Sequence, residues 1–251
     1  MNAHRSLLFC LICFSFCPFL FAQDAPETLA NKKIVILGDS STTSEMWPSK
    51  LISLYLPSSA QVINTAQGGS GWGKLGSCFS VEEQWEKAKK QLGEDVKPNI
   101  LILTTGGNCF PDSSLTYDDV ITLCETAELN PDAGQMECAI LALRKILSDC
   151  PELDVYLVAN FYAGSSPAKD VRRRHYRTQL AALCDFYSCH LIDLTRNSGI
   201  RGRMEQTPEE RIFTTDAVHL STEKGKLRVA RLIFAAVKAN YPESEKSSSE
   251  D

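Results

Sequence analysis

The chain has 251 residues, of which 43% are hydrophobic and 23% are charged, and its formal net charge is −5. These proportions are those of ordinary globular proteins, so they argue against a disordered or a fibrous chain. The negative charge argues against nucleic acid as a partner, because binding to phosphates needs a basic face. The length is enough for one domain with a well-buried core.

The N-terminal segment has the pattern of a signal peptide. Residues 7–22 are almost wholly apolar, contain Pro18 and end at Ala22, which polar residues follow. This run is shorter than the roughly 20 residues of a membrane-spanning helix. We expect residues 1–22 to be cleaved, which predicts a secreted or periplasmic protein with no stable membrane insertion after cleavage. An uncleaved N-terminal anchor is the alternative.

The remainder is expected to form one domain at residues 23–242. The last residues, 243–251, are charged and rich in serine, which is typical of a disordered tail. Nothing in the sequence indicates the oligomeric state.

The cysteines predict no metal site. Three of the ten lie in residues 1–22, and seven remain in the exported chain: Cys78, Cys109, Cys124, Cys138, Cys150, Cys184 and Cys189. Export permits disulfides, but the number is odd and the spacing does not reveal a pairing. No pair of Cys-x-x-Cys motifs occurs. We therefore predict no zinc site.

Short β-branched apolar runs alternate with helical segments along the chain. Strands are expected at residues 33–37, 61–64, 99–104, 154–160 and 190–194. Helices are expected at residues 45–56, 80–92, 134–150, 170–187 and 221–240, the second opened by a capping box at Ser80 and the last capped by Ser221. This alternation predicts an α/β fold, a three-layer α/β/α sandwich around a five-stranded parallel sheet. Functional residues are then expected in loops at the carboxyl ends of the strands.

One connection is longer than its position requires. Residues 109–131 are acidic and rich in turn-forming residues. This segment either covers a pocket or forms an ordered surface excursion held by Cys109 or Cys124.

A serine follows the first predicted strand directly. Gly38-Asp39-Ser40 places a hydroxyl at the sharp exit of a buried strand, where a helix N-terminus can supply N–H groups to a developing anion. The same tripeptide also forms ordinary turns. Ser40 is thus a candidate nucleophile that needs support from elsewhere in the chain.

A histidine next to a carboxylate could activate that serine. Asp216 and His219 lie in the loop before the last predicted helix. A serine hydroxyl needs a base to take its proton, and the base works best when a carboxylate fixes its tautomer. The other histidines lie in the N-terminal segment, on a basic helix face and at the start of a strand: His4, His175 and His190.

Two further loops could stabilise an oxyanion. After the second strand, the sequence from Asn64 reaches Gly68 and Gly69, and glycines let backbone N–H groups approach a ligand closely. After the third strand, Gly106-Gly107-Asn108 offers a side-chain amide. The sequence of the glycine-rich stretch 68–75 also resembles a phosphate-binding loop, but Leu75 stands where that motif needs Ser or Thr.

Together these four blocks resemble the signature blocks of the SGNH (GDSL-like) hydrolases, and the resemblance spans almost the whole exported chain. It implies a flavodoxin-like fold with Ser40 as nucleophile and first oxyanion donor. It also implies Gly69 as the backbone donor, Asn108 as the amide donor, His219 as the general base and Asp216 as its orienting carboxylate. No metal or cofactor is implied.

The sequence departs from the family pattern at three positions. Cys109 stands where the third block usually has Asp, Ser41 where a leucine often follows Gly-Asp-Ser, and Ala66 where glycine is common. None of these removes a catalytic group, but Cys109 puts in doubt how the Asn108 loop is braced.

The resulting prediction is a secreted serine esterase that hydrolyses short-chain O-acetyl esters on carbohydrate through an acyl-enzyme. Its substrate would be a small-molecule or polysaccharide ester, with Asp39 beside the nucleophile and Trp72 near the oxyanion glycine as substrate-binding residues. The indole ring of Trp72 would stack on a sugar. A lipid or lysophospholipid esterase or thioesterase is the alternative enzyme, and a catalytically silent glycan-binding domain is the alternative of another class.

Overall fold

The structure is a computed structural model that describes residues 29–241 except 94, 106–107, 109–111, 131, 133, 162–166, 202–203, 206 and 217. The expected signal peptide and the expected C-terminal tail therefore lie outside the described residues. Within the described part of the chain, no helix has the length and apolar character that crossing a membrane requires.

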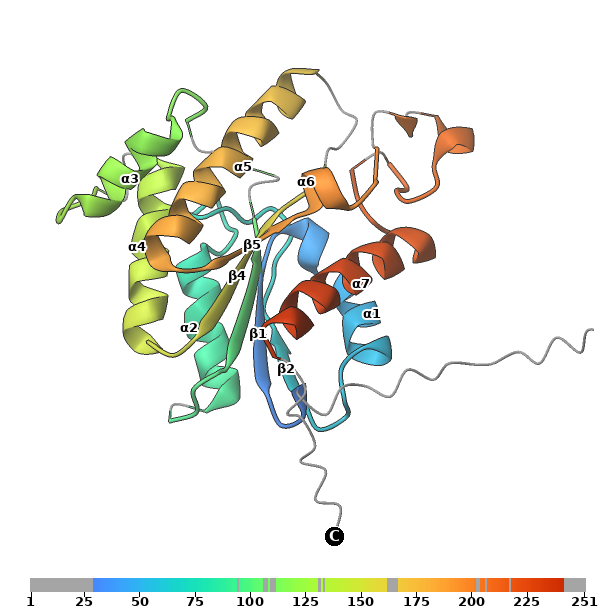
Figure 1. The fold of residues 1–251 in the computed structure, drawn as a ribbon, viewed down its shortest axis with the longest axis horizontal. Coiled ribbons are helices and arrows are strands. Elements are labelled where there is room, and N and C mark those ends of the chain that lie inside the picture. The colour runs from blue at the N-terminus through green and yellow to red at the C-terminus, as the bar shows by residue number, and fades with distance from the viewer. Residues whose placement is uncertain are drawn as a thin grey trace, which may run out of the picture.

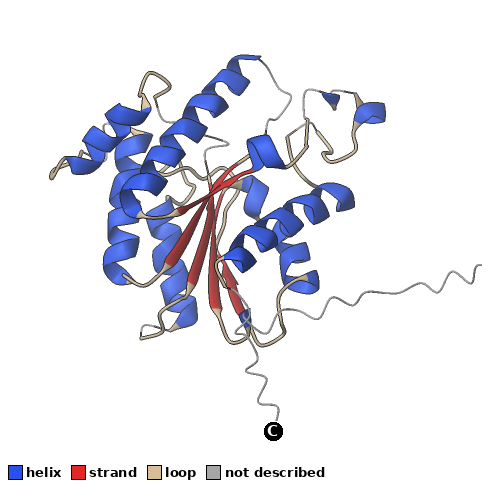
Figure 2. Cartoon of the chain, viewed as in Figure 1, coloured by secondary structure: helices blue, strands red, loops and turns tan. Residues whose placement is uncertain are grey.

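Five parallel strands form one central sheet, as predicted (Figure 2). The strands are β1 (Lys33–Gly38), β2 (Gln61–Asn64), β3 (Ile100–Thr104), β4 (Asp154–Ala159) and β5 (His190–Asp193). Their order is β2-β1-β3-β4-β5. The chain runs from β1 outwards to β2 and then crosses to β3, so the strand order reverses between β1 and β3. In such sheets a ligand binds at the carboxyl ends of the strands beside this switch point.

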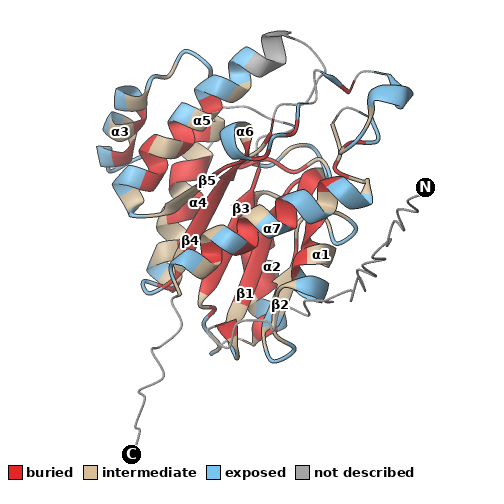
Figure 3. Ribbon diagram, turned by 45° about the vertical axis from the view of Figure 1, so that its right-hand side comes forward, coloured by how far each residue is buried: buried red, intermediate tan, exposed pale blue. Residues whose placement is uncertain are grey.

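Helices cover both faces of the sheet and make the predicted three layers (Figure 1). One face carries α2 (Val81–Leu92), α4 (Gln135–Asp149) and α5 (Pro167–Tyr187), and the other carries α1 (Trp47–Leu54) and α7 (Glu223–Ala239). Successive residues of β1 and β3 point to opposite faces and feed two separate apolar clusters. Both faces of these central strands are consequently buried, as Figure 3 shows in red.

The starts of three helices can be compared with their predictions. The capping box at Ser80 is confirmed: Ser80 Oγ accepts a hydrogen bond from the Glu83 N–H at 3.2 Å, and Glu83 Oε2 accepts one from the Ser80 N–H at 2.8 Å. The expected cap at Ser221 is wrong, because α7 begins at Glu223 and the hydroxyl of Thr222 accepts from the Gly225 N–H at 3.0 Å. Helix α5 also begins earlier than predicted, at Pro167.

The long connection after β3 contains a helix that the sequence pattern did not predict. This helix is α3 (Tyr117–Glu125), capped by Thr116, and its Val120 and Cys124 side chains are buried in the core. Arg144 of α4 donates to the Cys124 and Thr126 carbonyl oxygens at 2.9 and 2.7 Å. The described residues of this connection therefore form a packed surface excursion.

No disulfide holds this excursion within the described residues. The free thiols among the described residues include Cys78, Cys124, Cys150, Cys184 and Cys189. The burial of Val120 and Cys124 and the hydrogen bonds of Arg144 anchor α3 instead.

Candidate active site

Contacts with β3 and α2 fix the direction in which the chain leaves β1. A Cβ atom on Gly38, whose φ is +152°, would lie 2.0 Å from the Thr104 carbonyl oxygen of β3. Glycine is required there because no side chain fits. The buried Gln84 of α2 accepts from the Gly38 N–H at 2.8 Å and donates to the Gly38 carbonyl at 3.1 Å. Ser40 therefore leaves the strand on a fixed path and starts a single 3-10 turn, Ser40–Thr42.

The structure brings together Ser40, His219 and Asp216, which the sequence separates widely. Ser40 Oγ lies 3.1 Å from His219 Nε2, and His219 Nδ1 lies 2.6 Å from Asp216 Oδ2. The second carboxylate oxygen of Asp216 accepts from the backbone N–H groups of Val218 and His219, at 2.9 and 2.6 Å. A hydroxyl, an imidazole and a carboxylate thus form one hydrogen-bonded chain at the carboxyl edge of the sheet.

The environment of Asp216 favours its charged form. Burial alone would raise the pKa of this carboxyl, but hydrogen bonds from the His219 side chain and from the His219 and Val218 N–H groups lower the pKa overall. The carboxylate is then ionised at neutral pH and can hold a proton on Nδ1, which leaves Nε2 free to accept from Ser40. Its contribution to folding stability is present above the unfolded pKa and is lost as the pH falls through the lowered folded pKa.

The glycine turn after β2 lies against Ser40. A Cβ atom on Gly68 would come 3.8 Å from Ser40 Cβ, and the Gln67 N–H donates to the Gly38 carbonyl at 3.0 Å. Gly69 has a φ of +84°, in the left-handed region that favours glycine, and a Cβ atom there would lie 2.7 Å from Cys78 Sγ. The turn is thereby locked next to the candidate nucleophile.

Asn108 reaches the same turn from the end of β3. Its Nδ2 donates to the Ser70 carbonyl oxygen at 3.2 Å. An amide NH₂ group has two hydrogens, so one N–H of Asn108 remains for another acceptor. Gly106, Gly107 and Cys109, which also belong to this predicted block, lie outside the described residues.

Asp39, which the sequence predicted to bind substrate, is buried within the nucleophile loop. Its side chain is 1% exposed and accepts hydrogen bonds from the N–H and the hydroxyl of Ser41, at 2.9 and 2.7 Å. Asn160, which follows β4, donates to the same Ser41 hydroxyl at 3.1 Å. A leucine at position 41 would keep the backbone bond but could not make the two hydroxyl bonds. The departure from the family pattern therefore has a structural use: the Ser41 hydroxyl ties the nucleophile loop to the end of β4.

Trp72, which was also predicted to contact substrate, is buried as well. Its indole is 1% exposed, and Nε1 donates to Tyr176 Oη of α5 at 2.8 Å. A ring buried in this way cannot stack on a sugar from solvent. Trp72 instead packs the loop after β2 onto the helical layer.

Glu205 supports the histidine loop and was missed in the sequence. Its carboxylate is 3% exposed and accepts hydrogen bonds from the Phe213 N–H at 3.1 Å and from the N–H and hydroxyl of Thr214, both at 2.8 Å. The Thr215 N–H in turn donates to the His219 carbonyl at 3.2 Å. Glu205 thus anchors the start of the loop that presents Asp216 and His219, which lies between α6 (Leu194–Asn197) and α7 (Figure 1).

Replacing Glu205 by alanine should lower the free energy of unfolding by about 3 kcal/mol, because it removes the carboxylate that accepts from the part-buried Phe213 N–H and from the buried N–H and hydroxyl of Thr214. Glu205→Gln keeps one oxygen acceptor and should lose less. Urea denaturation of both variants measures the difference. Glu152→Ala, at an exposed turn before β4, is the control and should behave as the parent protein. Equal stability of Glu205→Ala and the parent would show that the carboxylate does not hold the loop.

The described residues contain no group of three His, Cys, Asp or Glu side chains that could hold a metal ion. At this edge of the sheet, the side chains already named supply a hydroxyl, an imidazole, a carboxylate and hydrogen-bond donors.

Solved structures share this architecture over nearly their whole length. A carbohydrate acetylesterase from Sinorhizobium meliloti superposes with a TM-score of 0.53 at 13% identity, over 84% of this chain and 100% of that chain. The chain has the fold of the SGNH hydrolases. An aryl esterase from M. smegmatis matches with a TM-score of 0.53 at 13% identity, over 83% of this chain and 99% of that one.

A protein from Lactobacillus plantarum matches with a TM-score of 0.61 at 14% identity, over 85% of this chain and 99% of that chain. No family model and no curated protein matches the sequence. At these identities the likeness concerns the SGNH hydrolase fold alone, so the activity has to be argued from the site itself.

Proposed function

We propose that the chain is a serine esterase that hydrolyses carboxylic esters through an acyl-enzyme. The observation that carries this proposal is the hydrogen-bonded chain from Ser40 Oγ through His219 to Asp216. Its position at the carboxyl ends of β1 and β3, beside the switch in strand order, is where α/β sheets bind ligands. Hydroxyl, base and orienting carboxylate are the groups that nucleophilic acyl transfer needs.

In the proposed mechanism, His219 Nε2 takes the proton of Ser40 as Oγ attacks the ester carbonyl carbon. The carbonyl oxygen becomes an anion, which the backbone N–H groups of Ser40 and Gly69 and the free amide hydrogen of Asn108 stabilise. His219 then gives its proton to the departing alcohol. A water molecule, deprotonated by His219, attacks the acyl-enzyme and releases the acid and Ser40.

For the substrate, we propose short-chain O-acetyl groups on carbohydrate, in a secreted or periplasmic setting. The signal-peptide pattern of residues 1–22 supports contact with extracellular polymers. The fold is also that of a solved carbohydrate acetylesterase. A lipid esterase is the competing choice, and it predicts a preference for long acyl chains.

The test is to rank hydrolysis of acetyl-xylan, acetyl-pectin and p-nitrophenyl esters of increasing acyl length by the chain lacking residues 1–22. We expect acetate release from a polysaccharide and a fall in kcat/KM from the acetyl to the octanoyl ester. A preference for the octanoyl ester would contradict the carbohydrate substrate, and hydrolysis of none of these esters would contradict the esterase itself.

A further inference from the structure

Phe79 is an exposed aromatic residue at the edge of the sheet that carries the candidate site. It lies immediately before α2, on the connection that follows the carboxyl end of β2. The two large aromatic side chains that stand out as exposed among the described residues are Phe79, at 36%, and Phe186, at 37%. Phe186 is near the end of α5, just before β5 begins, and so lies at the opposite edge of the sheet. Of these two, Phe79 is thus the one at the edge of the sheet that carries Ser40.

The segment of Phe79 is bonded directly to the glycine turn. The Phe79 N–H donates to Gln67 Oε1 at 2.7 Å, and Cys78 Sγ donates to the Gly68 carbonyl at 3.4 Å. Gly68 in turn approaches Ser40, as described above. Two short links therefore connect the Phe79 backbone to the glycine turn that lies against the candidate nucleophile.

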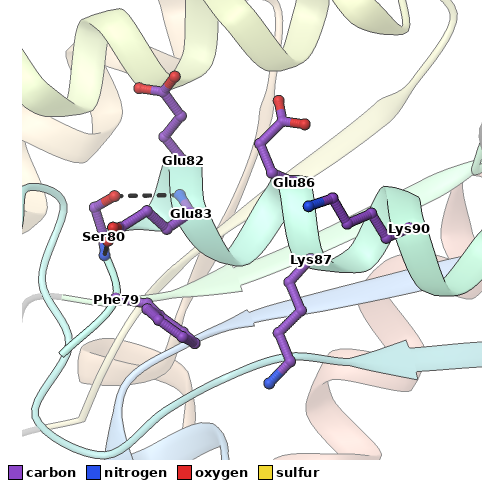
Figure 4. Close-up of a pocket in the computed structure, with 7 residues that line it drawn as sticks. All are labelled: Phe79, Ser80, Glu82, Glu83, Glu86, Lys87 and Lys90. Carbon is purple, nitrogen blue, oxygen red and sulfur yellow. Dashed lines mark hydrogen bonds between the residues drawn. The ribbon is translucent and has the colours of Figure 1, made fainter.

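The ring borders a surface hollow of about 560 Å³ along α2 (Figure 4). Phe79 and Lys87 lie on one side of the helix and Glu82 and Glu86 on the other. The Lys87 ammonium is 5.5 Å from the centroid of the Phe79 ring, which helps to hold the ring in place.

The charged groups of this hollow are nearly balanced. Three glutamates and two lysines line it: Glu82, Glu83, Glu86, Lys87 and Lys90. Glu83 and Glu86 are engaged with Lys74 and with Lys89 and Lys145. Glu82 and Lys90 are exposed, and none of the ion pairs among the described residues involves them. Near-neutral charge with free donors and acceptors suits a ligand rich in hydroxyl groups better than an anionic one.

We propose that Phe79 and the α2 hollow form a subsite for a neutral sugar chain whose acetyl group is presented to Ser40. The inference rests on the proposed esterase function and names how its substrate is held. The ring supplies an apolar face for a sugar, while Lys87, on the same side of α2, hydrogen-bonds its hydroxyl groups. This aromatic platform replaces the one that the sequence assigned to Trp72.

Binding can be tested without catalysis. The Ser40→Ala chain is titrated calorimetrically with xylohexaose, a neutral unacetylated probe, and with oligogalacturonate of equal length. We expect xylohexaose to bind, and Phe79→Ala in the same background to weaken it about tenfold. Phe79→Trp should bind as well as the parent, and Phe186→Ala, which removes a ring of the same exposure elsewhere, should change nothing.

Three outcomes would overturn the subsite: no binding of xylohexaose, equal affinity of Phe79→Ala and Phe186→Ala, or tighter binding of oligogalacturonate. With active protein, Phe79→Ala should raise KM about tenfold for acetylated xylo-oligosaccharides and leave KM for p-nitrophenyl acetate unchanged. If the parent chain does not hydrolyse p-nitrophenyl acetate, the proposed esterase function is contradicted, whatever the binding result.

Discussion

Alanine at position 40 should lower kcat for p-nitrophenyl acetate by about 10⁴–10⁶-fold, and His219→Ala should lower it by a similar factor. Each variant removes one end of the 3.1 Å contact through which the serine proton leaves. Because the two groups act as a unit, the double variant should lose no more than either single one. Release of p-nitrophenol at saturating substrate measures kcat for the two single variants and the double variant.

The control for these variants is Ser44→Ala, a nearby exposed serine whose hydroxyl contacts only Glu45 among the bonds described for it. It should keep the parent kcat. Additive losses in the Ser40→Ala and His219→Ala double variant would mean that the two residues act independently, which the proposed proton transfer does not allow.

Asn108→Ala should lower kcat by about 10²–10³-fold with little change in KM. The amide of Asn108 is fixed by its bond to the Ser70 carbonyl, so its second hydrogen can meet the anion that forms in the transition state. Substrate in its ground state carries no such charge, which is why KM should hardly move. Steady-state kinetics separate the two constants.

Asn130→Ala is the matched control, since Asn130 is exposed and its side chain accepts only from the Asp132 N–H among the described bonds. It should leave both constants unchanged. A rise in KM with unchanged kcat for Asn108→Ala would place Asn108 in ground-state binding and not in the oxyanion hole.

The sheet was predictable because its strands are buried on both faces and read as short continuous apolar runs. Helix α3 was not, because its N-terminal box uses Asp119 after Thr116 in a stretch that is otherwise acidic and rich in turns. The four loops of the candidate site were found because each carries a residue type suited to acyl transfer. Each of these loops also follows a predicted strand or precedes the last predicted helix, where functional loops are expected.

The remaining site residues act through contacts that sequence patterns do not encode. Gln84 and Glu205 hold backbone groups of distant segments, and any polar residue in a helix or loop would look the same in the sequence. Trp72 had the right neighbours along the chain, but its burial depends on Tyr176, far away in α5. Tertiary packing decides whether an aromatic side chain in such a loop contacts the core or is exposed, so Phe79 could be recognised only from its exposure.

The most direct test of the central claim is to treat the chain with a fluorophosphonate and locate the adduct by peptide mass spectrometry. An activated serine attacks phosphorus and expels fluoride, whereas an ordinary serine hydroxyl does not react. We predict one adduct, on the peptide containing Ser40, that is absent from Ser40→Ala and strongly reduced in His219→Ala. An unlabelled protein, or an adduct on another residue that persists in Ser40→Ala, would contradict the assignment of Ser40 as the nucleophile.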